Sequence, residues 1–435
     1  MYNKACIILF LIFTLSCNKN TKNNPQSKLY SKWIIESRMG DFSNKKKNSS
    51  FKTDTTERNV EWDYVPGLVA KAILMTFEYY KDQEWSQDLF EAIEDYADNT
   101  TINVGESNID DINAGKIFFE LHREAVNRNL PEKVEIYRQK AKFCFDQIIN
   151  SQIRIQPPMD GVNGFWHKKK YVNQMWLDGL FMGAAFYAEY LGNFGNTLED
   201  EKRAAHWDDI ALQFDIIFNK TWDPEKKLNY HAWSAEPLNS ASEFWANPET
   251  GRSSEFWSRG MGWFFASLVD VLEFFPADHH ARPQIVEYAN MVAEGLKQRQ
   301  DSLSGCWYQL LQYDDSKSSS CGNNNYLESS GSALFTYAYL KGIRLGILDR
   351  ENYLPTATAA YNGFVINFIK EETDGKIKII QSCESAGLSS DRKGDADYYL
   401  CGEDAIINNN TEGKVLGPFI MAALEYEKHT NSNLP

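Results

Sequence analysis

The stretch WLDGLFM, residues 176–182, places one carboxylate, Asp178, among large apolar side chains. Around it, apolar or small residues recur at a helical spacing, at Met175, Gly179, Met182, Phe186 and Tyr190. This period predicts a helix that begins near residue 176 and buries one face, with Asp178 beside that face. A buried Asp is uncommon unless it is paired or functional. Taken alone, the stretch favours the simpler interpretation, an Asp that caps the helix or lies in its first turn.

Apolar stripes with the same period continue through most of the chain and predict an all-α protein. We expect helices over residues 29–39, 66–81, 86–97, 112–127, 132–152, 176–191, 200–219, 259–274, 283–299, 331–347, 352–371 and 416–428. Short strands are expected over residues 307–313 and 376–381. About twelve helices joined as consecutive hairpins predict a closed toroid of paired helices.

Long polar or glycine-rich connections separate several of these helices. They cover residues 39–61, 153–175, 221–258, 301–330 and 372–415. Loops of this length within a compact domain tend to be functional. Because alternate loops of a helical toroid lie on one rim, we expect side chains from these loops to meet at one mouth.

The composition limits the partners of the protein. Its 435 residues include 45 Lys and Arg against 60 Asp and Glu, a formal net charge of −15. We therefore expect no nucleic-acid partner, although a few cations that converge locally can bind a small anion. The 12 Trp and 22 Tyr residues supply amphipathic rings that suit carbohydrate surfaces and helix packing alike. The sequence does not determine the oligomeric state.

Several motifs of catalysis and metal binding are missing. The chain has no glycine-rich phosphate loop, no HExxH, no GxSxG and no CxxC pair. We expect no metal and no cofactor. If the protein leaves the cytoplasm, Cys306 with Cys321, or Cys383 with Cys401, are candidate disulfides.

The first residues predict export. Residues 1–17, MYNKACIILFLIFTLSC, combine an early Lys with an apolar run too short for a permanent spanning helix, as in a signal peptide. Leu15-Ser16-Cys17 resembles a bacterial lipobox, which predicts a lipid on Cys17. Residues 18–28 then form a flexible tether to a single domain over residues 29–430. We expect a lipoprotein in the periplasm or at the cell surface that contacts the membrane only through its lipid anchor.

Polar side chains of the types that serve in catalysis and ligand binding lie in the loops and at the helix starts that follow them. Asp110 belongs to IDDIN, residues 109–113, where one Asp is expected to cap a helix and the other is a candidate site carboxylate. His167 lies in GFWHKK and His231 in YHAW, each beside aromatic residues. An isolated His is more often structural, but these surroundings raise the case for a functional one.

Arg259 lies between Trp257 and Trp263 in WSRGMGW. A stacked Arg presents a rigid fork to a carboxylate, and a cation–π helix cap explains it equally well. Gln309 follows two aromatic residues, and Glu328 either holds sugar hydroxyls or caps the helix that begins near residue 332. Carboxylates, imidazoles, Arg and indoles together indicate a carbohydrate-active enzyme or a glycan-binding protein.

These stretches together resemble the unsaturated glucuronyl and rhamnogalacturonyl hydrolases of glycoside hydrolase family 105. The matching pieces are IDDIN with AGK, GFWHKK, MWLDGLFM, YHAW, ANPETGRSSEFWSRGMGW, YLESSGSALFTYAYLKGIRLG and VLGPFIMAALE. They follow the family's order from about residue 30 to 428 and imply an (α/α)6 barrel.

The resemblance also implies roles for individual residues. Asp178 matches the catalytic acid/base of a W-[VL]-D motif, and Asp110 matches a second carboxylate in a motif usually written L-D-S-I-N. The residues implied to line the substrate pocket are His167, His231, Trp257, Arg259, Trp263, Gln309 and Glu328. Residues 383–412 fit the family pattern loosely.

The implied reaction is hydration of a vinyl ether. The substrate is the 4,5-unsaturated uronic acid that a polysaccharide lyase leaves at a non-reducing end, for example from ulvan or rhamnogalacturonan. Asp178 would protonate C4 and assist water at C5, which requires a protonated Asp178 near neutral pH. Arg259 is the expected partner of the substrate carboxylate. The alternatives are a non-catalytic surface glycan-binding lipoprotein and a hydrolase of unsaturated glycosaminoglycan fragments.

Overall fold

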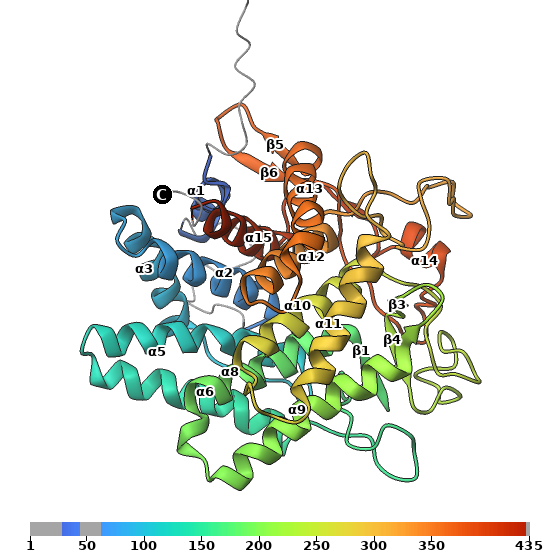
Figure 1. Cartoon of the computed structure of the whole chain (residues 1–435), viewed down its shortest axis with the longest axis horizontal. Coiled ribbons are helices and arrows are strands. Elements are labelled where there is room, and N and C mark those ends of the chain that lie inside the picture. The colour runs from blue at the N-terminus through green and yellow to red at the C-terminus, as the bar shows by residue number, and fades with distance from the viewer. Residues whose placement is uncertain (1–27, 44–61, 432–435) are drawn as a thin grey trace, which may run out of the picture.

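The computed structural model describes residues 28–43 and 62–431, whose helices follow one another as hairpins around a common centre (Figure 1). The inner helices are α2 (Tyr64–Tyr80), α5 (Ile117–Asn127), α8 (Ala185–Phe194), α10 (Ser258–Phe274), α12 (Ser329–Arg344) and α15 (Gly413–Asn431). The outer helices are α1 (Tyr30–Ser43), α3 (Glu84–Asn99), α6 (Pro131–Asn150), α9 (Asp200–Thr221), α11 (Arg282–Lys297) and α13 (Arg350–Phe368). Each inner helix packs against the next, and α15 packs against α2 to close the ring. The fold is an all-α (α/α)6 barrel, as predicted.

The two rings differ in how their sequences are buried. Inner helix α12 is buried at every position from Ser329 to Ile343. Outer helix α9 buries only eight of its 22 residues, along one face. A helix with apolar or small residues all round is stable only when surrounded, whereas a one-sided stripe suits a helix that faces water. The hydrophobic pattern therefore assigns each helix to its ring.

Two inner helices are entered through short segments, and a third short helix lies in a loop. The helix α4 (Asp110–Asn113) and a 3-10 turn (Ala114–Lys116) lead into α5. The helix α7 (Leu177–Gly179) and a π-helical turn (Leu180–Ala184) lead into α8, and a 3-10 turn (Gly195–Thr197) follows it. The short helix α14 (Ala396–Cys401) lies in the loop before α15. Irregular turns of this kind are frequent at functional sites.

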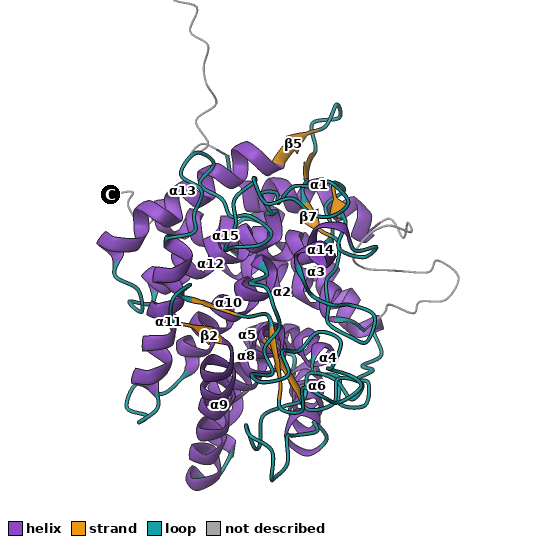
Figure 2. Ribbon diagram, turned by 90° about the vertical axis from the view of Figure 1, so that its right-hand side faces the viewer, coloured by secondary structure: helices purple, strands orange, loops and turns teal. Residues whose placement is uncertain are grey.

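All the long connections that the structure describes lie at one end of the barrel. They join an outer helix to the start of the next inner helix, over residues 100–109, 151–176, 222–257, 298–328 and 369–412. Figure 2 looks onto this end, where loops and short strands lie in front of the helices. We call it the loop rim. The opposite end, where the inner helices finish, is the basal end, and its connections are short.

Short antiparallel strand pairs organise the loop rim. They are β1 (Gln174–Trp176) with β4 (Ala232–Ser234), β2 (Trp222–Asp223) with β3 (Leu228–Asn229), β5 (Ile369–Glu371) with β6 (Ile377–Ile379), and β7 (Ser382–Cys383) with β8 (Ile407–Asn408). The first pair joins two loops that are far apart in sequence, with Trp176 opposite Ala232. This pairing brings the residues after Trp176 close to those before Ala232.

One glycine allows two inner helices to begin in contact. A Cβ on Gly331 in α12 would lie 2.0 Å from the hydroxyl of Ser258, the first residue of α10. No side chain fits that gap. Gly331 thus holds the starts of α10 and α12 close together on the loop rim.

Each of the twelve predicted helices is present, although the helix expected over residues 176–191 is divided among α7, the π-helical turn and α8. The strand expected over residues 376–381 is the shorter β6. The strand expected over residues 307–313 is wrong: Tyr308 and Leu310 form only isolated bridges, because their partners come from two different loops. The sequence analysis also missed α14, which has only six residues.

The disulfide prediction is wrong in both of its alternatives. Cys321 is bonded to Cys401, while Cys306 and Cys383 are free and buried. The bonded pair joins the loop before α12 to α14, where Asn323 also donates a hydrogen bond to the Leu400 carbonyl at 2.9 Å. The spacing of the cysteines along the chain does not show which loops meet. The disulfide pairing follows from the packing of the loop before α12 against α14.

The signal peptide, residues 18–27 of the tether and the lipid on Cys17 lie outside the described residues. Among the helices of the described chain, none is both long enough and apolar enough to cross a membrane.

Candidate active site

Asp178 and His231 meet because β1 pairs with β4. The Leu177 N–H donates to the His231 carbonyl at 3.0 Å, which extends the strand pair by one residue. His231 Nε2 then lies 3.1 Å from Asp178 Oδ2. The Asp178 side chain is 14% exposed, whereas His231 is fully buried. Asp178 is thus a first-turn residue of α7 that faces an imidazole on one side and the open rim on the other.

Asp110 occupies a different electrostatic environment. His167 Nε2 lies 3.2 Å from Asp110 Oδ1, and the Lys168 ammonium lies 2.5 Å from Oδ2. These two partners hold the pKa of Asp110 well below its usual range, although burial opposes them. The loop that carries them is fixed by the Ile109 N–H, which donates to the His167 carbonyl at 3.2 Å. Asp110 is therefore an ionised carboxylate at neutral pH.

The neighbouring Asp111 does not share this role. Its Oδ2 accepts hydrogen bonds from the Gly105 N–H at 2.9 Å and from Asn108 Nδ2 at 2.8 Å. Burial raises the pKa of Asp111 to about 6. Asp111 closes the turn before α4, and Asp110 is left for the site.

A wall of stacked rings joins the two carboxylates. The His167 ring stacks on Trp176 with a centroid distance of 4.7 Å and an interplanar angle of 5°. Tyr171 also stacks on Trp176, at 4.5 Å. Next to Asp178, Gly179 leaves room for this arrangement, because a Cβ there would lie 3.1 Å from His167 Nδ1. The positions of His167 and Asp178 thus depend on each other.

Tyr399 completes the Asp178 environment, although sequence analysis did not select it. Its hydroxyl lies 2.7 Å from His231 Nδ1, so both ring nitrogens of His231 have partners. Trp257 covers the same imidazole at a centroid distance of 4.7 Å. Tyr399 belongs to α14, in the segment that resembles the family least, so no motif marked it.

Arg259 lies in a second charged cluster at the rim. Its Nη1 is 3.3 Å from Glu412 Oε1, its Nη2 donates to the Glu384 carbonyl at 3.4 Å, and its guanidinium lies 5.1 Å from the Trp257 ring centroid. Lys414 Nζ contacts the other oxygen of Glu412 at 2.8 Å. Two cations thus share the Glu412 carboxylate, and the buried Glu328 carboxylate also acts on Arg259.

Arg259 is only 1% exposed, and its partner in this structure is a carboxylate of the same chain. Its predicted contact with a substrate carboxylate remains a prediction. Glu412 and Lys414 were missed, but they stand at the start of an inner helix, as Asp110 and Asp178 do. Tyr64, at the start of α2, was missed as well; burial, followed by the charge of Asp110, raises its pKa.

Four further predicted pocket residues are buried behind this surface. Trp257 and Trp263 are each 2% exposed, and Gln309 and Glu328 are fully buried. Trp263 packs on Phe181 at 4.7 Å, and Gln309 bridges the Trp257 indole and the Tyr399 carbonyl at 3.2 and 3.3 Å. These contacts support the site from below, and direct contact with substrate remains a prediction for all four.

Of the two roles predicted for Glu328, its geometry matches that of a helix cap. Its Oε1 accepts from the Ser330 and Cys383 backbone N–H groups at 3.0 and 2.9 Å, and its Oε2 accepts from the Gly331 N–H at 2.7 Å. It is the N-cap of α12 and also anchors β7. Both of its carboxylate oxygens therefore already accept hydrogen bonds from backbone N–H groups.

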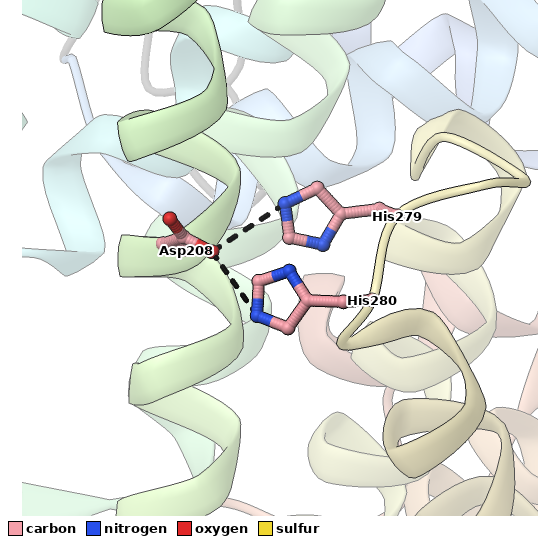
Figure 3. Close-up of side chains that lie close together, drawn as sticks. All are labelled: Asp208, His279 and His280. Carbon is pink, nitrogen blue, oxygen red and sulfur yellow. Dashed lines mark ion pairs between the residues drawn. The ribbon is translucent and has the colours of Figure 1, made fainter.

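One group of metal-ligand side chains in the described residues could share an ion, and it lies away from the loop rim. Figure 3 shows His279 and His280, from the loop between α10 and α11, facing Asp208 of α9. Each Nε2 is 3.5 Å from the same oxygen of Asp208. The Ala281 N–H donates to His279 Nδ1 at 3.3 Å, which leaves the single proton of a neutral ring on Nε2, directed at Asp208. This group plays no part in the site.

Comparison with known proteins fits this geometry. The sequence pattern of Glycosyl Hydrolase Family 88 matches residues 31–430. A solved family 105 glycoside hydrolase from C. acetobutylicum ATCC 824 is 34% identical, with a TM-score of 0.75 over 92% of this chain and all of that chain. This chain belongs to the family 88 and 105 glycoside hydrolases.

Two curated relatives of this glycoside hydrolase are also similar to it. Protein Atu3128 of Agrobacterium fabrum is 31% identical over 251 residues, which are 56% of this chain and 97% of that protein. The unsaturated 3S-rhamnoglycuronyl hydrolase of Formosa agariphila is 22% identical over 207 residues, 48% of this chain and 49% of that protein. The family membership supports a hydrolase whose substrates are oligosaccharides.

Proposed function

We propose that this glycoside hydrolase removes a 4,5-unsaturated uronic acid from the non-reducing end of lyase-generated oligosaccharides. Unsaturated uronyl-rhamnose is the proposed terminal unit. The similarity to the Formosa agariphila enzyme supports this substrate class. The observation that carries the proposal is the contrast between two carboxylates: Asp110 is paired with an imidazole and an ammonium, whereas Asp178 is paired with one imidazole.

In the proposed reaction Asp178 is the acid. Its proton goes to C4, water adds to C5 with loss of its proton to the resulting carboxylate, and the C4=C5 double bond is consumed. The C5 hemiketal opens to a ketone, and the hemiacetal left at C1 then collapses and releases the shortened sugar. No carboxylate attacks the anomeric carbon, in contrast to the usual pair of glycosidase carboxylates.

The His231–Tyr399 pair can hold the proton on Asp178. A carboxylic acid donates to Nε2 only if Nε2 is unprotonated, and then the Nδ1 proton points to the Tyr399 oxygen at 2.7 Å. Asp110 stays ionised between His167 and Lys168 and positions substrate hydroxyls. The two cations of the Arg259–Glu412–Lys414 cluster face the uronate carboxylate.

The test is the ultraviolet absorbance of the unsaturated unit. Purified protein is incubated with lyase digests of ulvan, rhamnogalacturonan and a glycosaminoglycan. We expect the absorbance to fall on a rhamnose-containing digest. Loss only on the glycosaminoglycan digest would assign the alternative hydrolase activity, and binding without loss on any digest would leave a glycan-binding protein.

We also propose that Cys17 carries the lipid anchor of a periplasmic or surface lipoprotein. Intact-mass measurement of the mature protein tests this, with Cys17→Ala as the control. An unmodified wild-type mass that begins at another residue would contradict it.

A further inference from the structure

A second cavity opens at the basal end of the barrel. Its volume is about 380 Å³, within the range of roughly 300–1,000 Å³ found for small-molecule sites. Every inner helix or its entry segment contributes to the wall. The charged and amide side chains that line it are Lys71, Glu78, Asn113, Lys116, Glu120, Arg123, Glu189, Asp270, Glu273, Lys341, Arg344 and Lys428.

This basal cavity is separated from the active site by packed rings. Phe181 lines the cavity and packs at 4.7 Å on Trp263, which is 2% exposed. The deep residues Asn113 and Lys116 are 1% and 4% exposed, whereas Tyr79 at the mouth is 37% exposed. The cavity is a funnel that narrows toward the underside of the active-site floor.

Most of the lining charges are ion-paired, and the lining as a whole has six cations against five carboxylates. Lys71 contacts both Glu120 and Glu189 at 2.5 Å. Lys341 contacts Asp270 at 2.7 Å and Glu273 at 2.8 Å. Buried ion pairs with this geometry account for their own charges and need no ligand.

Lys116 is different. Its ammonium donates to the Phe181 carbonyl at 3.1 Å and lies 4.0 Å from the Phe181 ring centroid. Among the described residues no carboxylate is within ion-pair distance of it. Burial lowers its pKa to about 8, although the charges of Asp270 and Glu189 act on it from beyond contact distance and oppose this. A carboxylate that entered the cavity would supply a counter-ion in direct contact.

Two unpaired acceptors lie on the same wall. Asn113 Oδ1 and Glu120 Oε2 are buried and have no hydrogen-bond partner in the described structure. Buried polar atoms normally have partners, so such groups call for an occupant that can donate hydrogen bonds. Hydroxyl groups do so. At the partly exposed mouth, Arg123 forms no ion pair with any described residue and adds a further cation.

We propose that the basal cavity is a second binding site, for a small hydroxylated carboxylate of the size of a hexuronate. The carboxylate binds the Lys116 ammonium at the deep end. The hydroxyls donate to Asn113 and Glu120, and Arg123 attracts the anion to the mouth. The site is independent of the reaction at Asp178.

The test is calorimetric titration of the full-length protein with sodium D-glucuronate, with glucose as the neutral probe. We expect glucuronate to bind and Lys116→Met to weaken it about tenfold or more, since a hydrogen bond to a charged group is lost. Lys142→Met, on the exposed face of α6, is the matched control and should leave this binding unchanged. Arg123→Gln should weaken binding by a smaller factor; because it lies at the mouth, it decides the question if Lys116→Met does not fold.

Three results would overturn the proposal. The first is no heat with millimolar glucuronate, which means that the cavity holds water only. The second is equal binding of glucose, and the third is glucuronate binding that neither Lys116→Met nor Arg123→Gln weakens.

Discussion

The two ends of the barrel use the same inner helices in opposite ways. At the loop rim, where these helices begin, Asp110, Asp178 and Glu412 stand in or just before first turns. At the basal end, Lys341, Arg344 and Lys428 stand in last turns. Helix dipoles favour anions at N-terminal ends and cations at C-terminal ends. All the inner helices point the same way, so the dipoles favour these residues, whereas Arg259 in the first turn of α10 and Glu273 in its last turn oppose the dipole and are held by ion pairs.

The ends differ in what happens to those charges. Basal Lys341 is tied to two carboxylates within 2.8 Å and is 5% exposed. Rim Asp178 has one imidazole partner at 3.1 Å and remains 14% exposed. We therefore expect most basal charges to contribute to stability and the rim charges to contribute to turnover. The following substitutions test this division.

The largest expected effect is that of Asp178→Asn. Removing the acid should lower kcat by about 10²–10⁴-fold while the melting temperature stays close to that of the wild type. Asp208→Asn, on outer helix α9, is the matched control and should retain full activity. Substantial turnover by a folded Asp178→Asn protein would remove Asp178 from the mechanism.

Lys341→Met tests the basal end. It leaves Asp270 and Glu273 buried without their cation, so the free energy of unfolding should fall by about 3–5 kcal/mol. Chemical denaturation measures this, with the exposed Lys142→Met as the control, for which we expect a change below about 1 kcal/mol. At temperatures where Lys341→Met is folded, its kcat should equal that of the wild type. A drop in kcat without a drop in stability would contradict the division.

We also expect a residue of the loop rim, Glu255, to make the stability of the protein depend on pH. Burial raises the pKa of Glu255 to about 7, and its carbonyl accepts from the His231 N–H at 3.3 Å. Since the folded pKa is raised, the stability contribution is full below the unfolded pKa near 4.5 and is lost as pH rises through about 7.

Glu255→Gln should therefore flatten the decline in stability between pH 5 and 8, by at most about 3 kcal/mol. Melting curves across that range measure it. Glu249→Gln, on the exposed surface of the same loop, should leave the wild-type slope unchanged. If stability declined with pH equally in the wild type and both variants, burial of Glu255 would not be the source of the decline.

The smallest effect is expected for Tyr399→Phe. Losing the 2.7 Å contact with His231 Nδ1 should lower kcat about tenfold with little change in KM, since it removes one hydrogen bond that orients the imidazole. Tyr398→Phe is the neighbouring control, because its hydroxyl contacts Gly387 and Asp404 instead. A loss confined to KM would place Tyr399 in substrate binding.

The sequence by itself determined the helical architecture. Apolar stripes of period 3.6 dictate where helices form, because each stripe gives its segment a face to bury whichever helix it packs against. The same local logic located Asp178, Asp110, His167 and His231, which stand in loops or at helix starts with distinctive neighbours.

Only the tertiary structure decided which of these residues act together. The contact between Asp178 and His231 depends on β1 pairing with β4, and that between His231 and Tyr399 joins residues 168 positions apart. The Cys321–Cys401 bond and the Glu412 partner of Arg259 likewise depend on which loops dock. Such contacts leave no periodic trace in the chain, since they are set by the packing of loops whose conformations are fixed only when the barrel closes.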